Sequence, residues 1–162
     1  MSKFDSSFDL RPRSKGSYRR GVDDIFRALN TLRVDELKPV AAFLFYYLAC
    51  EKLAKIMKGV CTGKKYKEIF APNSRTPSAE DIRKYSNQLG GKAAGADFDA
   101  IFDRKRKNSA RSLRDKIIHE IGPSHAKQIV NAAPSLVPKM KKFLKYNDAV
   151  IQYLQKLHSV KS

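Results

Sequence analysis

Residues 35–60, "DELKPVAAFLFYYLACEKLAKIMKGV", decide the fold of this chain. Asp35 is suited to cap a helix N-terminus, and Pro39 falls in the first turn, where its missing N–H costs no hydrogen bond. Beyond Pro39, apolar side chains occur all round a helical projection, as expected of a helix enclosed by its neighbours. We therefore predict that this stretch is the central, most buried helix of the domain.

Segments with helical periodicity lie on both sides of this stretch. In residues 18–33, apolar side chains recur every three or four positions, which predicts an amphipathic helix. Ser78, with Asp81 three residues later, resembles a helix N-cap, and the short helix that it starts is expected to end at Gly90-Gly91. The intervening residues 59–77 are the main candidate for a functional loop.

The C-terminal half is expected to be helical too. One helix should run from about residue 97 to 121, where Gly122-Pro123 would end it, and two more segments lie around residues 124–132 and 135–157. No stretch keeps the alternation of a β-strand for long. The pattern predicts an all-α bundle of about five or six helices.

The length of 162 residues is enough for one hydrophobic core, so we expect a single domain. That domain should occupy residues 18–162. Residues 1–17 mix Ser, Gly, Pro and charge without a period, which indicates a flexible basic N-terminal arm.

The charge of the chain is strongly positive. Lys and Arg number 33 against 16 Asp and Glu, which gives a net charge of +17 and favours polyanionic partners. Nucleic acid is the leading candidate, although an anionic membrane or an acidic protein would also fit. The basic residues cluster in residues 52–67 and 104–116. The predicted nucleic-acid contacts are Arg104, Lys105, Arg106, Lys107, Arg111, Lys64 and Lys65.

Cysteine spacing and hydropathy indicate no cofactor and no membrane span. Cys50 and Cys61 are the two cysteines, and their separation of eleven residues places them on about the same side of one helix, so we expect buried free thiols. No spacing typical of a zinc site occurs, and no metal or other cofactor is expected. The longest apolar run, residues 40–50, is too short to cross a bilayer, and no signal-peptide pattern is visible, which favours a soluble, cytoplasmic protein.

The stretch "RSLRDKIIHE", residues 111–120, combines charge with a histidine. On a helix, one side of it is aliphatic and suited to packing, and comprises Ala110, Leu113, Ile117 and Ile121. Arg111, Asp115 and His119 follow one another at intervals of four on the opposite side. This pattern fits an exposed charged face in which Asp115 pairs with Arg111 or His119, or part of an RNA-cleaving site.

Two motifs resemble the HEPN superfamily. "RDKIIH", residues 114–119, is similar to the family's R-x4-6-H signature, in which Asn, Asp or His commonly follows the arginine. "FYYLACEKLAKIM", residues 45–57, resembles the preceding family helix, which commonly ends in an aromatic, small-residue and Glu-Lys pattern. The resemblance covers about residues 18–157.

The resemblance implies a helical bundle that forms a homodimer and, in many members, cleaves RNA without a metal. Other members have lost this activity. A role as a toxin or defence effector, with an antitoxin or other regulatory protein as partner, is also implied. Members that an antitoxin nucleotidylates have a tyrosine two residues after the histidine, whereas this chain has Ile121, which argues against that mode of regulation.

RNA carries its own nucleophile, the ribose 2′-hydroxyl, so cleavage requires a proton-transfer group and a cation. His119 is suited to act as general base or acid, and the guanidinium of Arg114 to hold two phosphate oxygens. Asp115 would orient His119 or Arg114. Glu51 is a supporting candidate, although a surface pair with Lys55 is the favoured interpretation for it.

The spacing of Arg114 and His119 poses a geometrical problem. Five residues along a straight helix separate them by about 140° and about 7.5 Å of rise. Either the helix loosens before Gly122-Pro123, or two protomers each contribute one motif to a shared cleft. The resemblance favours the shared cleft.

Three functions remain open from these residues. The first is a metal-independent endoribonuclease, and the alternative is a non-catalytic basic module that binds RNA or DNA. The third is a structural partner in a larger complex. Among the other polar residues, His125 is expected near the cleft and His158 away from it, and Tyr46 and Tyr47 are expected in the core.

Overall fold

The computed structural model describes residues 38–90, 97–120 and 123–160. Within these ranges the chain forms helices and no strand, which confirms the all-α prediction. Two of the helices are short, with four and five residues. The helices are α2 (Lys38–Thr62), α3 (Tyr66–Ile69), α4 (Ala79–Gln88), α5 (Phe98–Phe102), α6 (Ala110–Glu120), α7 (Pro123–Leu144) and α8 (Tyr146–Val160). The predicted arm, the predicted helix at 18–33 and the Asp35 cap lie outside the described residues.

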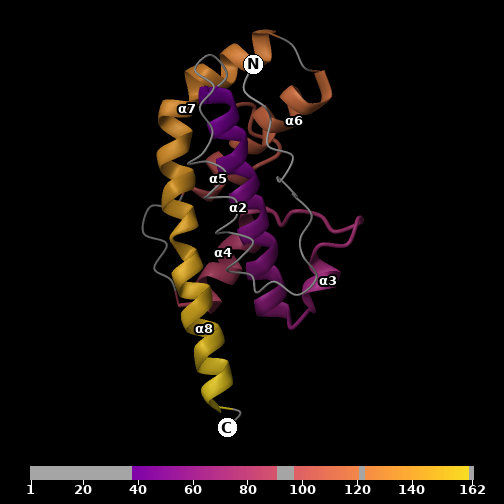
Figure 1. Ribbon diagram of the computed structural model, residues 1–162, viewed down its shortest axis with the longest axis vertical. Helices are drawn as coiled ribbons and strands as arrows, with labels where there is room; N and C mark the ends of the chain where they lie inside the picture. The colour runs from indigo at the N-terminus through magenta and orange to yellow at the C-terminus, as the bar shows by residue number, and fades with distance from the viewer. Residues whose placement is uncertain (1–37, 91–96, 121–122, 161–162) are drawn as a thin grey trace, which may run out of the picture.

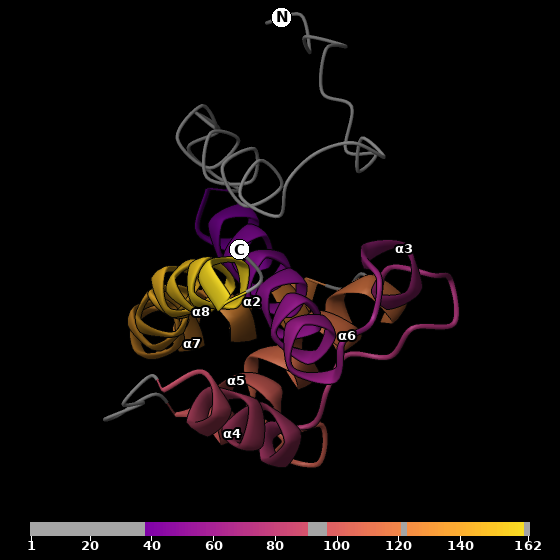
Figure 2. The same cartoon turned by 90° about the horizontal axis from the view of Figure 1, so that it is seen from below.

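Helix α2 is the centre of the bundle, as predicted. It contacts α3, α4, α6, α7 and α8, and Figure 2 shows it between the α7–α8 pair on one side and α3 with α6 on the other. Phe43, Tyr47, Leu53 and Met57 on this helix are fully buried. Since truncating one buried leucine or phenylalanine to alanine costs about 2–5 kcal/mol, α2 contributes much of the stability.

The helix predicted for residues 97–121 is in fact two helices, α5 and α6. Residues 103–109 separate them, because Ser109 caps α6 by accepting a hydrogen bond from the Ser112 N–H at 3.1 Å. The Ser109 hydroxyl also donates to the Asp103 carbonyl, which fixes the loop between the helices. Four consecutive cations in this loop repel one another, which further disfavours a continuous helix.

The division predicted between residues 132 and 135 is also wrong. Helix α7 runs through both Pro134 and Pro138, and the chain turns only at Lys145. Each proline removes a backbone donor from the helix. The burial of Ile129 and Met140, on either side of the prolines, holds the helix against the core. Figure 1 shows α8 continuing from the end of α7 in nearly the same direction, beside α2 and past its end.

The cap predicted at the start of α4 is confirmed. The Ser78 hydroxyl accepts a hydrogen bond from the Asp81 N–H at 3.1 Å, and the helix ends before Gly90, whose φ of 72° suits glycine. The loop expected at residues 59–77 is shorter than predicted, because α2 continues to Thr62 and α3 occupies part of the remainder. The irregular part of this segment that reaches the site is residues 70–78.

Both cysteines are free thiols on α2. Cys50 is fully buried as expected, whereas Cys61 is only partly buried, and its Sγ lies 3.8 Å from the Tyr85 carbonyl oxygen. Burial raises the pKa of Cys61 to about 11. Among the helices of the described ranges, none has the length and apolar character needed to cross a bilayer.

Candidate functional site

Arg114 joins the two sequence motifs in space. Its Nη2 lies 3.1 Å from Oε1 of Glu51, although 63 residues separate the two in the chain. Both side chains are largely enclosed, with exposed fractions of 19% and 18%. The "RDKIIH" stretch on α6 and the Glu-Lys pattern on α2 therefore meet at this ion pair.

The Arg114 guanidinium lies over the aromatic ring of Tyr47. The central guanidinium carbon lies 5.0 Å from the ring centroid, within the range of a cation–π interaction. Tyr47 precedes Glu51 by one helical turn, so both present their side chains to α6. Burial raises the pKa of the Tyr47 hydroxyl, and the Glu51 carboxylate raises it further, so this hydroxyl stays protonated.

Asp115 supplies a second carboxylate to the same cation. Nη1 of Arg114 lies 3.0 Å from Oδ1 of Asp115. Burial works to lower the pKa of Arg114, but Tyr47 and Glu51 outweigh it and raise the pKa, so the guanidinium remains charged. Of the two partners predicted for Asp115 in catalysis, the structure places it on Arg114. The exposed pair of Asp115 with Arg111 or His119 is not formed among the described residues.

The hydrogen-bonding capacity of Arg114 is only partly used. A guanidinium has five N–H donors, and the two carboxylate contacts involve one terminal nitrogen each. Nε is buried and has no hydrogen-bond partner in the described part of the chain. The two terminal nitrogens carry further N–H groups beside those that face the carboxylates, and 19% of the side chain is exposed.

Glu51 has a second partner, Thr76. The Thr76 hydroxyl, in the loop between α3 and α4, donates a hydrogen bond to Oε1 of Glu51, the oxygen that also faces Arg114. The interpretation of Glu51 as a surface partner of Lys55 is therefore wrong. The reason is that Glu51 lies on the side of α2 that packs against α6 and this loop.

His119 lies apart from Arg114. It is exposed in the last turn of α6, whereas Arg114 points toward α2. Helix α6 keeps its helical backbone through Glu120, so the proposed loosening before Gly122-Pro123 does not occur at His119. The separation of about 140° therefore persists within one chain. No contact between His119 and Asp115 forms among the described residues.

The predicted nucleic-acid contacts fall in two segments. Arg104, Lys105, Arg106 and Lys107 are all exposed in the α5–α6 loop, where Arg106 lies 3.8 Å from Asp97. Lys64 and Lys65 are exposed between α2 and α3. Arg111 is half-buried one turn before Asp115 on α6, near enough to lower the pKa of Tyr47. The first segment leads directly into α6.

Two residues of the site were missed by sequence reasoning. Tyr47 was assigned to the core alone, although its spacing of four from Glu51 signals a shared helix face. Thr76 gives no such signal, because it lies in a loop without a period. Its role depends on the fold of residues 70–78. Tyr46, the neighbour of Tyr47, is partly buried and lies under Lys141, whose Nζ is 5.4 Å from the ring centroid.

The described residues contain no group of three or more His, Cys, Asp or Glu side chains placed to hold a metal ion. Comparison of the chain with protein-family models, with curated proteins and with solved structures finds no match.

Proposed function

We propose that this chain is a metal-independent endoribonuclease of the HEPN type that acts as a homodimer. The observation that carries the proposal is the contact of Arg114 with Glu51. It joins the two segments that resemble the family, and it fixes an arginine whose side chain is still 19% exposed. A cation in this position is suited to stabilise the charge of a phosphorane.

The proposed reaction is an internal transesterification. A histidine, His119, accepts the proton of the ribose 2′-hydroxyl, and the 2′-oxygen forms a bond to phosphorus. The bond from phosphorus to the 5′-oxygen breaks, and that oxygen takes up a proton from histidinium or water. The products are a 2′,3′-cyclic phosphate and a 5′-hydroxyl, with Arg114 neutralising the charge on the phosphate oxygens.

Two protomers would bring an Arg114 and a His119 to the same phosphate, which a single helix cannot do. The side of α6 between Arg114 and His119 carries the half-buried Arg111 and Asp115 and the exposed Ile118, which is 50% exposed. An apolar side chain at the middle of a polar face suits a contact with a second copy. A partner seated there would bring its own His119 toward Arg114, because a two-fold interface pairs the same face of both subunits.

The alternative function is a non-catalytic module that binds RNA or DNA. The exposed cations of the α5–α6 loop favour it, since they need no reaction to explain them. Purified protein incubated with RNA in EDTA separates the two functions. Cleavage products with 2′,3′-cyclic phosphate ends support the nuclease, whereas binding with intact RNA supports the module.

A toxic or defensive role in the cytoplasm, restrained by an antitoxin or other regulatory protein, belongs to the same proposal. It rests on the resemblance of residues 114–119 and 45–57 to the family. Expression of the wild-type chain should arrest growth, and a variant that cannot cleave RNA should not. Growth arrest by both proteins would exclude cleavage as its cause.

A further inference from the structure

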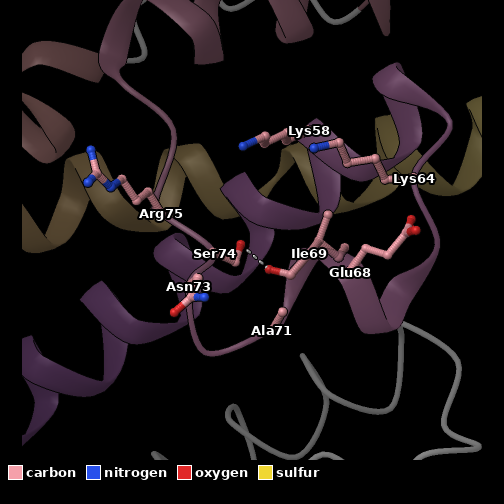
Figure 3. Close-up of a pocket in the computed structure, with 8 residues that line it drawn as sticks. All are labelled: Lys58, Lys64, Glu68, Ile69, Ala71, Asn73, Ser74 and Arg75. Carbon is pink, nitrogen blue, oxygen red and sulfur yellow. Dashed lines mark hydrogen bonds between the residues drawn. The ribbon is translucent and has the colours of Figure 1, made fainter.

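The end of α2, helix α3 and the loop that follows enclose a basic pocket with a volume of about 380 Å³. Three of its lining side chains are cations, namely Lys58, Lys64 and Arg75. Figure 3 shows the ammonium groups of Lys58 and Lys64 pointing the same way, toward the loop that carries Arg75, whose guanidinium points away from them. Polar side chains, among them Asn73 and Ser74, line the rest together with Ile69 and Ala71.

The cations of this pocket are not neutralised within the part of the chain that the structure describes. No ion pair there involves Lys58, Lys64 or Arg75. The pocket contains one carboxylate, Glu68, whose Oε2 accepts a hydrogen bond from the Lys65 N–H at 2.7 Å and is thereby held at the start of α3. Lys58 is half-buried, so its charge is incompletely hydrated, and no residue in the described ranges forms an ion pair with it. An anion in the pocket would supply such a partner.

The pocket is connected to the Arg114 site by covalent and hydrogen-bonded links. Arg75 directly precedes Thr76, whose hydroxyl donates to Glu51, the partner of Arg114. Ser74 is also fixed, because its hydroxyl donates to the Ile69 carbonyl. Lys58 follows Glu51 by seven residues on α2, which places it on the same side of that helix and about 10 Å farther along the axis. The pocket therefore lies beside the candidate site and is lined by residues other than Arg114 and Glu51.

We propose that this pocket binds a backbone phosphate of the RNA strand whose scissile phosphate lies at Arg114. The proposal deepens the proposed function and rests on it for the identity of the strand. Two ammonium groups suit the tetrahedral, multiply charged oxygens of a phosphate, Arg75 adds a third positive charge to the pocket lining, and the Asn73 amide is a further donor. The subsite would hold the strand in register while Arg114 and His119 act on another phosphate.

Binding to an uncleavable strand tests the subsite. The probe is a 2′-O-methyl RNA octanucleotide, which lacks the attacking hydroxyl. We compare the wild type with the Lys64→Gln/Arg75→Gln variant. The matched control is Lys142→Gln/Lys145→Gln, which removes the same charge from exposed lysines near the end of α7. Figures 1 and 2 place that end across α2 from α3.

The pocket variant should bind the octanucleotide about tenfold more weakly. Its log-log salt slope should be shallower by about 0.7, because one phosphate is no longer neutralised. The control should change affinity by less than about twofold, with the wild-type slope. Both variants should melt at the wild-type temperature, since the four substituted side chains are exposed.

Equal reductions of affinity in the two variants would overturn the subsite, as would a wild-type protein that does not bind the octanucleotide. A separate assay with cleavable RNA distinguishes this failure from failure of the proposed function. If the wild type cleaves RNA but the pocket variant binds like the control, the nuclease stands and the subsite does not. If the pocket variant alone binds weakly but the wild type cleaves nothing, the subsite stands without the nuclease.

Discussion

The guanidinium of Arg114 lies over the ring of Tyr47, 5.0 Å from its centroid, and Nη2 faces Glu51 at 3.1 Å. This arrangement makes the proposed catalytic cation part of the packing between α6 and α2. A residue that serves both roles is predicted to affect stability as well as activity.

Replacing Arg114 with alanine should lower the free energy of unfolding by about 1–3 kcal/mol, because it leaves Glu51 enclosed without its cation. A double-mutant cycle of Arg114→Ala with Glu51→Gln should give a coupling energy of about 0.5–1.5 kcal/mol. Urea denaturation measures both quantities. As control, Lys84→Ala removes an exposed pair with Glu80 and should leave the free energy of unfolding almost unchanged. A coupling energy near zero would mean that the Arg114–Glu51 contact does not contribute to stability.

Asp97 should stabilise the fold at neutral pH and lose this effect in acid. It accepts a hydrogen bond from the Ala100 N–H and lies 2.9 Å from Lys139, and the bond from Lys139 is the largest cause of its lowered pKa. A lowered folded-state pKa stabilises the protein above the ordinary value near ~3.9, and this contribution is lost as the pH falls through the folded pKa. The difference in stability between the wild type and Asp97→Asn should therefore shrink below about pH 4. Thermal unfolding between about pH 7 and about pH 2.5 measures it, and a constant difference would contradict the prediction.

The α5–α6 loop should bind nucleic acid without reading its sequence. Lys105 and Lys107 are exposed, and neither forms an ion pair with any residue that the structure describes, so Lys105→Gln/Lys107→Gln should weaken binding to unrelated RNA sequences to the same extent. The log-log salt slope should become shallower by about 0.7 for each phosphate that these lysines neutralise in the wild type. Fluorescence anisotropy at several salt concentrations measures both effects. Wild-type binding that does not change with salt would point to a protein partner instead.

Sequence patterns predicted the central helix and the start of α4 because helical periodicity and N-capping depend on residues that lie close together in the chain. The all-round apolar character of residues 35–60 identified the central helix, and Ser78 with Asp81 identified the start of α4. The break at residues 103–109 was missed because it depends on the Ser109 cap, and the division between residues 132 and 135 was wrong because burial of α7 keeps that helix continuous. The same holds for the site: the separation of Arg114 from His119 follows from helix geometry, whereas the pairing of Glu51 with Arg114 and Thr76 requires the packed bundle.

A shared site predicts complementation between inactive chains. His119→Ala and Arg114→Ala should each be inactive alone, but a mixed dimer contains one site that takes Arg114 from one chain and His119 from the other. After complete subunit exchange, the mixture should recover about one quarter of the wild-type rate, since half of the dimers are mixed and each has one intact site of two. An Ile118→Asp substitution in both chains should abolish the dimer and the recovery. Absence of recovery in a proven mixed dimer would exclude a site of this composition.

The central claim is that His119 transfers a proton during RNA cleavage. The most direct test is the rate of RNA cleavage in EDTA by His119→Ala, compared with His158→Ala, which is the same substitution in helix α8. We predict that His119→Ala cleaves on the order of 10²-fold or more slowly while its RNA affinity and helix content remain at wild-type levels, and that His158→Ala cleaves normally. Cleavage by His119→Ala at the wild-type rate would contradict this mechanism and leave the basic nucleic-acid-binding module as the function.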